Sequence, residues 1–245
     1  MSAVQRTIAV GVGGASGLQA LAWAADEAAG PQDRLVLLRA CPSCSPLAGL
    51  AGEPPVPLLE RANPGLARAV AATVRREGQR RFRVLVGDPA AALADASASA
   101  DLLVIGATAG TVAAQVASHL HCPLVVVHPV PAEPGDPFAG HVVVGVDGSD
   151  AGRAALDFAF GYADAHRLPV AAVPASGSNA ELRDAEVEPW ELKYPRVRVL
   201  RADPAGGLTR AVTAQARCPV TVVPLPHDEP RHPGLGSTRA PDQRR

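Results

Sequence analysis

Two glycine-rich turns follow apolar, β-branched runs, and such turns let backbone N–H groups approach a phosphate. The first, GVGGASG, covers residues 11–17, and the second, VGVDGS, covers residues 144–149. Each turn leads into an alanine-rich stretch typical of a helix. Where the second turn has Asp147, the first has Gly13. We therefore expect two related turns, of which only the second offers a carboxylate to a ligand.

The first turn also nearly matches the dinucleotide-binding pattern G-x-G-x-x-G, with Ser16 in place of the last glycine. Arg39, at the end of the next apolar run, stands where an NADP-binding protein places a basic residue. A single imperfect match is a weak signal, and a solvated arginine at a strand end explains Arg39 equally well. A nicotinamide-dependent enzyme is therefore kept only as a remote alternative.

Cys41 and Cys44 form a Cys-x-x-Cys motif at the end of that same run. Redox chemistry would need the motif at a helix N-terminus, whereas Pro46 and nearby glycines indicate a loop. A zinc site would need more ligands, and HLHC at residues 119–122 is the nearest source. We expect ordinary thiols and no metal site.

Asp147 and Asp150 could pair as carboxylates, but helix capping by Ser149 or Asp150 is the favoured role. No catalytic constellation is found.

The chain contains an imperfect internal repeat. Three anchors recur in the same order, and the spacing between matching anchors shrinks along the chain, so the second copy is the shorter. The anchors are Ile8 and Val142, the DPA at Asp88 and Asp203, and the CP at Cys122 and Cys218. We expect a first domain at 1–130, a linker at 131–140, a truncated second domain at 141–225 and a disordered tail at 226–245.

The first copy reads as five strands alternating with helices, which predicts a parallel α/β sheet. The run 7–12 is apolar throughout, as a strand buried on both faces requires, whereas 81–87 alternates with arginines and suits an edge strand. The predicted apolar stripe of the first helix is Leu18, Leu21, Ala22 and Ala25. A long irregular stretch precedes a helix that carries Leu66, Val70 and Val74. In the second copy, the segment from Asp203 to Cys218 is too short for a helix, a strand and another helix, so one helix–strand pair has been lost.

Composition excludes several classes of protein. A formal charge of −1 over 245 residues gives no electrostatic case for a nucleic-acid partner. Aromatic residues make up only 3% of the chain, so it has few side chains on which nucleic-acid bases could stack. No apolar run is long enough to span a membrane, and no signal-peptide core is found near the first residues, so the expected compartment is the cytoplasm. Four cysteines do not indicate a disulfide framework.

Four motifs, in order, resemble the universal stress protein family, and the chain as a whole resembles a tandem member of it. They are VGVDGS at 144–149, GDPA at 87–90, DLLVIG at 101–106 and the two CP strands. The resemblance implies two Rossmann-like parallel-sheet domains of the adenine nucleotide alpha hydrolase-like type, the second of them truncated. Family members that bind ATP resemble one another in an Asp after the first strand and a long glycine loop after the fourth.

By that resemblance, the residues expected to face adenine nucleotide come from both copies. They are Val12, Gly13, Ala40, Gly106, Gly110, Thr111 and Asp147. The family pattern is broken in each copy: the first lacks the Asp and the inner part of the loop, and the second lacks the loop. Because turns alone explain these glycines, structural turns are favoured over a working ATP site.

The function that the resemblance implies is a stress-response binding or scaffold module, not an enzyme, with at most weak binding of adenine nucleotide in the first domain. The alternative is an ATP-binding member with slow hydrolysis. A protein partner is expected but not named by the sequence. The resemblance also predicts antiparallel pairing of Leu124–His128 with Val220–Val223 inside one chain, a pseudo-dimer, and leaves a homodimer open.

Overall fold

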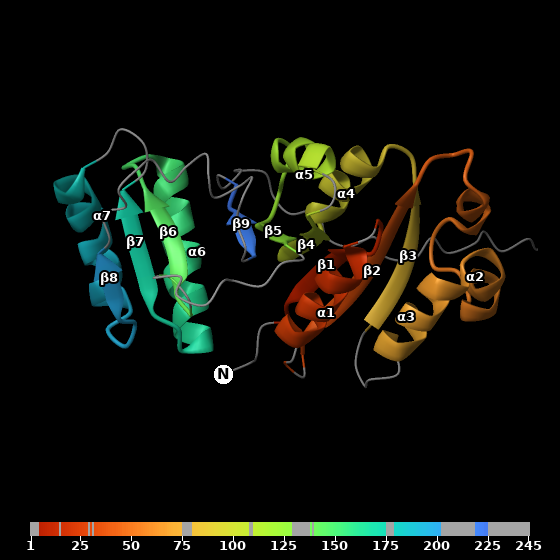
Figure 1. The fold of residues 1–245 in the computed structure, drawn as a ribbon, viewed down its shortest axis with the longest axis horizontal. Coiled ribbons are helices and arrows are strands. Elements are labelled where there is room, and N and C mark those ends of the chain that lie inside the picture. Colours follow the sequence, from red (N-terminus) through yellow and green to blue (C-terminus); the bar gives the residue numbers. More distant parts are fainter. Residues whose placement is uncertain are drawn as a thin grey trace, which may run out of the picture.

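The computed structural model describes residues 5–14, 16–28, 30, 32–74, 80–107, 110–128, 138, 140–174, 179–201 and 219–224. The described strands form two sheets, a six-stranded sheet in the order β3-β2-β1-β4-β5-β9 and a three-stranded sheet in the order β6-β7-β8 (Figure 1). Helices alternate with strands along most of the chain. The α/β class and the mostly parallel sheet are as predicted.

Five parallel strands from the first half build most of the larger sheet. They are β1 (Thr7–Gly11), β2 (Arg34–Cys41), β3 (Arg80–Val86), β4 (Leu102–Gly106) and β5 (Leu124–Val127). β1 and β4 are buried almost throughout, as their continuous apolar sequences predict. β3 lies at the edge of the sheet, which confirms the prediction made from its alternating arginines.

Helices cover both faces of this sheet. Residues of α1 (Gly17–Glu27) and α3 (Pro64–Val74) pack with the face that carries Ile8 and Val10. Residues of α4 (Pro89–Ser97) and α5 (Gly110–Ala117) pack with the opposite face. Because successive side chains of a strand point to opposite faces, the alternate residues of each strand fall into two separate cores.

Two details of the first half differ from the sequence predictions. The predicted apolar stripe of α1 is right at Leu21, which is buried, and wrong at Leu18, which is 62% exposed. The buried face also includes Ala20 and Ala24, so it consists mostly of small residues that allow close approach of the helix to the sheet. The stretch expected to be irregular contains a 3-10 helix, η1 (Pro46–Leu50), and a short helix, α2 (Val56–Ala62).

The second half begins with the same order of elements as the first. β6 (Val142–Val146), α6 (Asp150–His166), β7 (Val170–Pro174), α7 (Ala180–Lys193) and β8 (Val199–Arg201) follow one another. β6 pairs with β7 and β7 with β8, all parallel, around a core that contains Phe160 and Leu156. Three regions with sequence predictions lie outside the described residues: the segment 203–218 with the expected loss of a helix and a strand, most of the linker 131–140, and the tail 226–245.

β9 (Val220–Val222) joins the two halves, because it pairs antiparallel with β5 as an edge strand of the larger sheet and lies between β5 and α6 in the view of Figure 1. Its register sets Leu124 opposite Val222 and Val126 opposite Val220. This pairing confirms the antiparallel contact predicted from the two apolar strands.

Candidate functional site

The expected site residues of the first half gather at the carboxyl edge of the six-stranded sheet. β1 lies between β2 and β4, so Gly13, which follows β1, has Ala40 of β2 on one side and Gly106 of β4 on the other. The chain leaves β1 toward one face through α1 and leaves β4 toward the other through α5. Ligands of open parallel sheets bind at such a point.

Val12 serves the core of the protein. Its N–H donates to the carbonyl oxygen of Leu38 at 2.9 Å, and its side chain is 6% exposed within the core below α1. Its N–H is therefore already used by the sheet. Ala40, the next-to-last residue of β2, is half-buried.

Gly13 lies under a cation. A Cβ atom built on this exposed glycine would lie 3.1 Å from Nη1 of Arg39. The Nε atom of Arg39 is buried and has no hydrogen-bond partner. The position that carries Asp147 in the second half is therefore occupied in the first half by a guanidinium from the neighbouring strand. This reverses the sign of the charge at the edge.

Gly106 is required by packing. A Cβ atom at this position would overlap the side chain of Ser16 and would lie 2.5 Å from its carbonyl oxygen. Gly17 is equally close, since a Cβ atom there would lie 2.8 Å from the carbonyl carbon of Val12. Ser16 itself is 2% exposed. The start of α1 is therefore pressed against the ends of β1 and β4, and these glycines have a structural reason that needs no ligand.

Gly110 and Thr111 are the first two residues of α5, so the turn predicted before the helix is in part its first turn. Their side chains lie outside the described residues. The N-terminus of α5 carries a partial positive charge and free N–H groups, as every helix start does.

Asp147 lies in the other sheet, at the carboxyl end of β6, and the structure does not bring it together with the residues of the first half. Its Oδ1 accepts hydrogen bonds from the N–H of Ser149 at 2.9 Å and from the hydroxyl of Ser149 at 2.6 Å. The hydroxyl bond is the largest of the effects that hold the pKa of Asp147 below its ordinary value. Ser149 in turn caps α6 by accepting from the N–H of Gly152, as predicted.

Two further polar groups near strand ends were not singled out from the sequence as site residues. His128 directly follows β5, its Nε2 is buried without a hydrogen-bond partner, and burial lowers its pKa. Arg39 was weighed only as a reader of NADP. Both have in common a buried nitrogen with no hydrogen-bond partner, a feature that depends on neighbouring strands and has no signature in the sequence.

The cysteine motif is divided between two environments. Cys41 ends β2 and is buried, whereas Cys44 lies in the turn that follows and is exposed. Cys122 is buried and Cys218 lies outside the described residues. Within the part of the chain that the structure describes, no three metal-binding side chains lie close enough to hold an ion.

Comparison with known proteins identifies the first half. The model of the universal stress protein family matches residues 5–128, which include β1 to β5 and the whole carboxyl edge described above. The chain belongs to the universal stress protein family.

Curated relatives and solved structures agree with this assignment. The universal stress protein Rv2623 of Mycobacterium tuberculosis is 32% identical in an alignment of 142 residues, and the alignment covers 46% of this chain and 48% of the relative. A second, Rv3134c of the same organism, is 33% identical in an alignment of 158 residues, and the alignment covers 55% of this chain and 56% of the relative. The chain thus spans about half the length of these relatives. A universal stress protein from Archaeoglobus fulgidus shares the fold over 92% of this chain and 98% of its own, with a TM-score of 0.62 at 13% identity.

In the part of the present chain that the structure describes, every helix is too short or too polar to cross a membrane.

Proposed function

We propose that this universal stress protein is a binding module of the stress response without catalytic activity, and that its first half binds adenine nucleotide weakly. The observation that carries the proposal is the cation at Gly13. Where the family resemblance places a carboxylate, the guanidinium of Arg39 lies 3.1 Å from the Cβ position. A nucleotide bound at this edge would have no carboxylate partner at position 13, but the N-terminus of α5 could still bind a phosphate.

The second half supports the same proposal from the opposite direction. Asp147 is held by Ser149 in the turn that starts α6, so its carboxylate supports the local backbone. Within the described residues, β6 pairs with β7 alone and no strand lies beside it in the place that β4 has beside β1. We propose that 141–225 is a truncated second domain that lacks a crevice for nucleotide, and that the first domain comprises 1–130.

Titration calorimetry of the full chain with ATP tests this proposal. We expect a dissociation constant of about 0.1 mM or weaker. Gly110→Val should weaken binding further, because a branched side chain would obstruct the start of α5. Asp147→Asn is the matched control and should leave binding unchanged, since the amide oxygen can still accept from Ser149. Micromolar affinity in the unaltered chain, or loss of binding in Asp147→Asn, would refute the proposal.

A pair of substitutions tests the role of the cation itself. Gly13→Asp alone should not raise affinity, because the new carboxylate would pair with Arg39. Together with Arg39→Gln, the same Gly13→Asp should tighten ATP binding about tenfold, the usual worth of one hydrogen bond to a charged group. Equal gains in the single and double variants would show that Arg39 does not control the site.

A further inference from the structure

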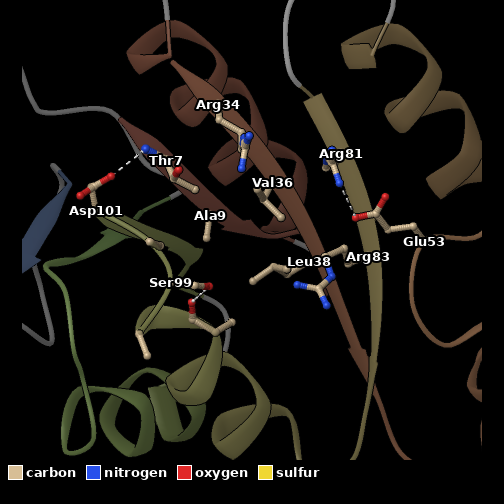
Figure 2. Close-up of a pocket in the computed structure, with 13 residues that line it drawn as sticks. Thr7, Ala9, Arg34, Val36, Leu38, Glu53, Arg81, Arg83, Ser99 and Asp101 are labelled. Atoms are coloured by element: carbon tan, nitrogen blue, oxygen red, sulfur yellow. Dashed lines mark hydrogen bonds and ion pairs between the residues drawn. The ribbon is translucent and has the colours of Figure 1, made fainter. Parts of the chain in front are cut away.

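A cavity of about 350 Å³ opens at the other end of the six-stranded sheet, away from the carboxyl edge. It is lined by the starts of β1, β2 and β3, by the end of α4 and the turn into β4, and by Glu53 (Figure 2). Thr7, Arg34 and Arg81 are the first or second residues of their strands, which places the cavity on the amino-terminal side. We propose that this cavity binds a small organic monocarboxylate, with its carboxylate on Arg83 and its hydrocarbon part on the sheet.

The floor of the cavity is an apolar part of the sheet beside the end of α4, where Val36 is partly exposed while Ala9 and Leu38 are 3% and 2% exposed. Ala9 of β1 and Val36 and Leu38 of β2 line it. They lie on the face that α4 and α5 cover, but α4 ends at Ser97, and the chain then turns through Ala98 and Ala100 toward β4. A surface of this kind suits a short aliphatic or aromatic body, and the volume is within the range of small-molecule sites.

Arg83 supplies a cation for which the described part of the chain shows no ion-pair partner. Its Nε is buried without a hydrogen-bond partner, and among the described residues no carboxylate forms an ion pair with it. Figure 2 shows its guanidinium reaching from β3 toward Leu38 on β2, at the edge of the apolar floor. Arg83 as a whole is half-buried, and a buried Nε–H without an acceptor is costly, so an anion that enters the cavity offers this group the partner that it lacks.

The other charged groups in the wall already have partners. Arg81 donates to Glu53 at 3.3 Å, and Asp101 accepts from the N–H of Thr7 at 2.9 Å. Among the described residues, three arginines and two carboxylates line the cavity, which leaves one formal positive charge. A single carboxylate balances that charge, whereas a doubly charged phosphate would leave an excess negative charge. The charge and the apolar floor together favour a monocarboxylate with a hydrocarbon body over a phosphate.

This site is distinct from the nucleotide site proposed above, and its test does not depend on it. The two lie at opposite ends of the same strands: Arg34 begins β2 and Ala40 lies near its end. ATP binding and carboxylate binding can therefore fail separately.

The test is NMR titration of the full chain, labelled with ¹⁵N, against three probes. Hexanoate carries both the charge and the body, hexan-1-ol carries the body alone, and inorganic phosphate carries the charge alone. We expect saturable shifts with hexanoate, with a dissociation constant of about 1 mM or tighter, and at least tenfold weaker binding of the other two. Phosphate or hexan-1-ol binding as tightly as hexanoate would overturn the proposal, as would the absence of saturation by hexanoate.

Two variants and a matched control locate the binding. Arg83→Gln should weaken hexanoate binding about tenfold or more, the usual loss for a hydrogen bond to a charged group. Arg198→Gln is the control. Arg198 ends the RVR at 196–198 as Arg83 ends the RFR at 81–83, but Arg198 is exposed and is not among the residues that line this cavity. It should leave binding unchanged.

Val36→Phe fills the floor of the cavity without altering a charge, and it should abolish hexanoate binding while the ATP titration stays as in the unaltered chain. This variant keeps the proposal testable if Arg83→Gln does not fold. Unchanged hexanoate binding in Val36→Phe, or equal losses in Arg83→Gln and Arg198→Gln, would place the ligand elsewhere and refute the proposal.

Discussion

A Cβ atom at Gly106 would lie 2.5 Å from the carbonyl oxygen of Ser16, and one at Gly17 would lie 2.8 Å from the carbonyl carbon of Val12. Neither glycine has a positive φ angle, so close approach and not backbone conformation is the reason for both. Any larger residue would push α1 away from the sheet. Gly13 differs, because the nearest atom to its Cβ position is the end of a flexible arginine.

His128 gives a prediction about acid stability. Burial lowers its pKa below the ordinary 6.5, so in the folded state it stays neutral at a pH where the unfolded chain takes up a proton. The unfolded state then binds more protons, and the stability associated with His128 is lost as the pH falls below about 6.5. We expect His128→Gln to reduce the loss of unfolding free energy between pH 7 and pH 5.

Urea unfolding at several pH values checks this expectation. His119→Gln is the control, because it makes the same substitution at an exposed histidine near the end of α5. If His128→Gln and the unaltered chain lose the same free energy over this range, the buried ring is not responsible for the acid sensitivity.

The sequence identified several site positions but could not show how they are used. Gly13 and Asp147 were recognised as equivalent because the repeat aligns them. The guanidinium over Gly13 comes from Arg39 on β2, and its direction depends on the twist and register of two strands. The cavity beside Arg83 depends likewise on where α4 ends over a sheet that it covers only in part.

At the scale of elements, local patterns predicted most of the fold. Continuous apolar runs gave the buried strands, alternation with arginines gave the edge strand β3, and β9 was placed beside β5. The stripe of α1 was right at Leu21 and wrong at Leu18, because the buried face runs through Gly17, Ala20, Leu21 and Ala24. A periodicity argument that gives little weight to glycine and alanine places such a face incorrectly.

The pairing of β9 with β5 predicts a defined response to a backbone change. Thr221 lies opposite Val125 in the antiparallel register. Thr221→Pro removes an N–H group and fixes φ, so the short β9 strand should detach at a cost of about 1–3 kcal/mol in unfolding free energy. The apolar edge of β5 would then be exposed and should promote association between copies.

Light scattering after size exclusion measures that association. Thr221→Val is the matched control, since it keeps the N–H group and the β-branched shape, and it should elute as the unaltered chain does. Thr221→Pro with an unchanged mass and an unchanged unfolding free energy would show that β9 does not protect β5.

At the scale of the molecule, α6 of the second half contacts α1 of the first through one buried carboxylate. The side chain of Glu27 is 4% exposed and accepts from Arg6 at 2.6 Å. From α6, the hydroxyl of Tyr162 donates to Glu27 at 3.3 Å, and Nε2 of His166 lies 3.4 Å from it. Phe158, one turn before Tyr162, packs against the core of the first half. This contact was not predicted, because the sequence shows Glu27 only as a charged residue at a helix end.

The phenol of Tyr162 reports on this contact. Burial, and to a smaller extent the carboxylate of Glu27, raises the pKa of Tyr162 to about 12. The neutral phenol therefore contributes stability that is present below about pH 10 and is lost as the pH rises toward 12. Glu27→Gln removes the smaller cause and should lower the pKa of Tyr162 without returning it to the ordinary 10, because burial persists.

A double-mutant cycle between the two halves decides whether Glu27 couples them. Glu27→Gln should lower the unfolding free energy by about 1–3 kcal/mol, since Arg6 and Tyr162 lose a charged acceptor, while Tyr162→Phe should cost about 1 kcal/mol. If the bond from Tyr162 to Glu27 joins the halves, the double variant should lose less than the sum of the single losses by about 0.5 kcal/mol or more. The cycle with Tyr194→Phe in place of Tyr162→Phe is the control, because Tyr194 packs with Phe160 inside the second half and should give additive losses. Additive losses for Glu27 and Tyr162 as well would mean that this bond does not couple the two halves, which would leave the approach of His166 to Glu27 and the packing of Phe158 as the contacts between them.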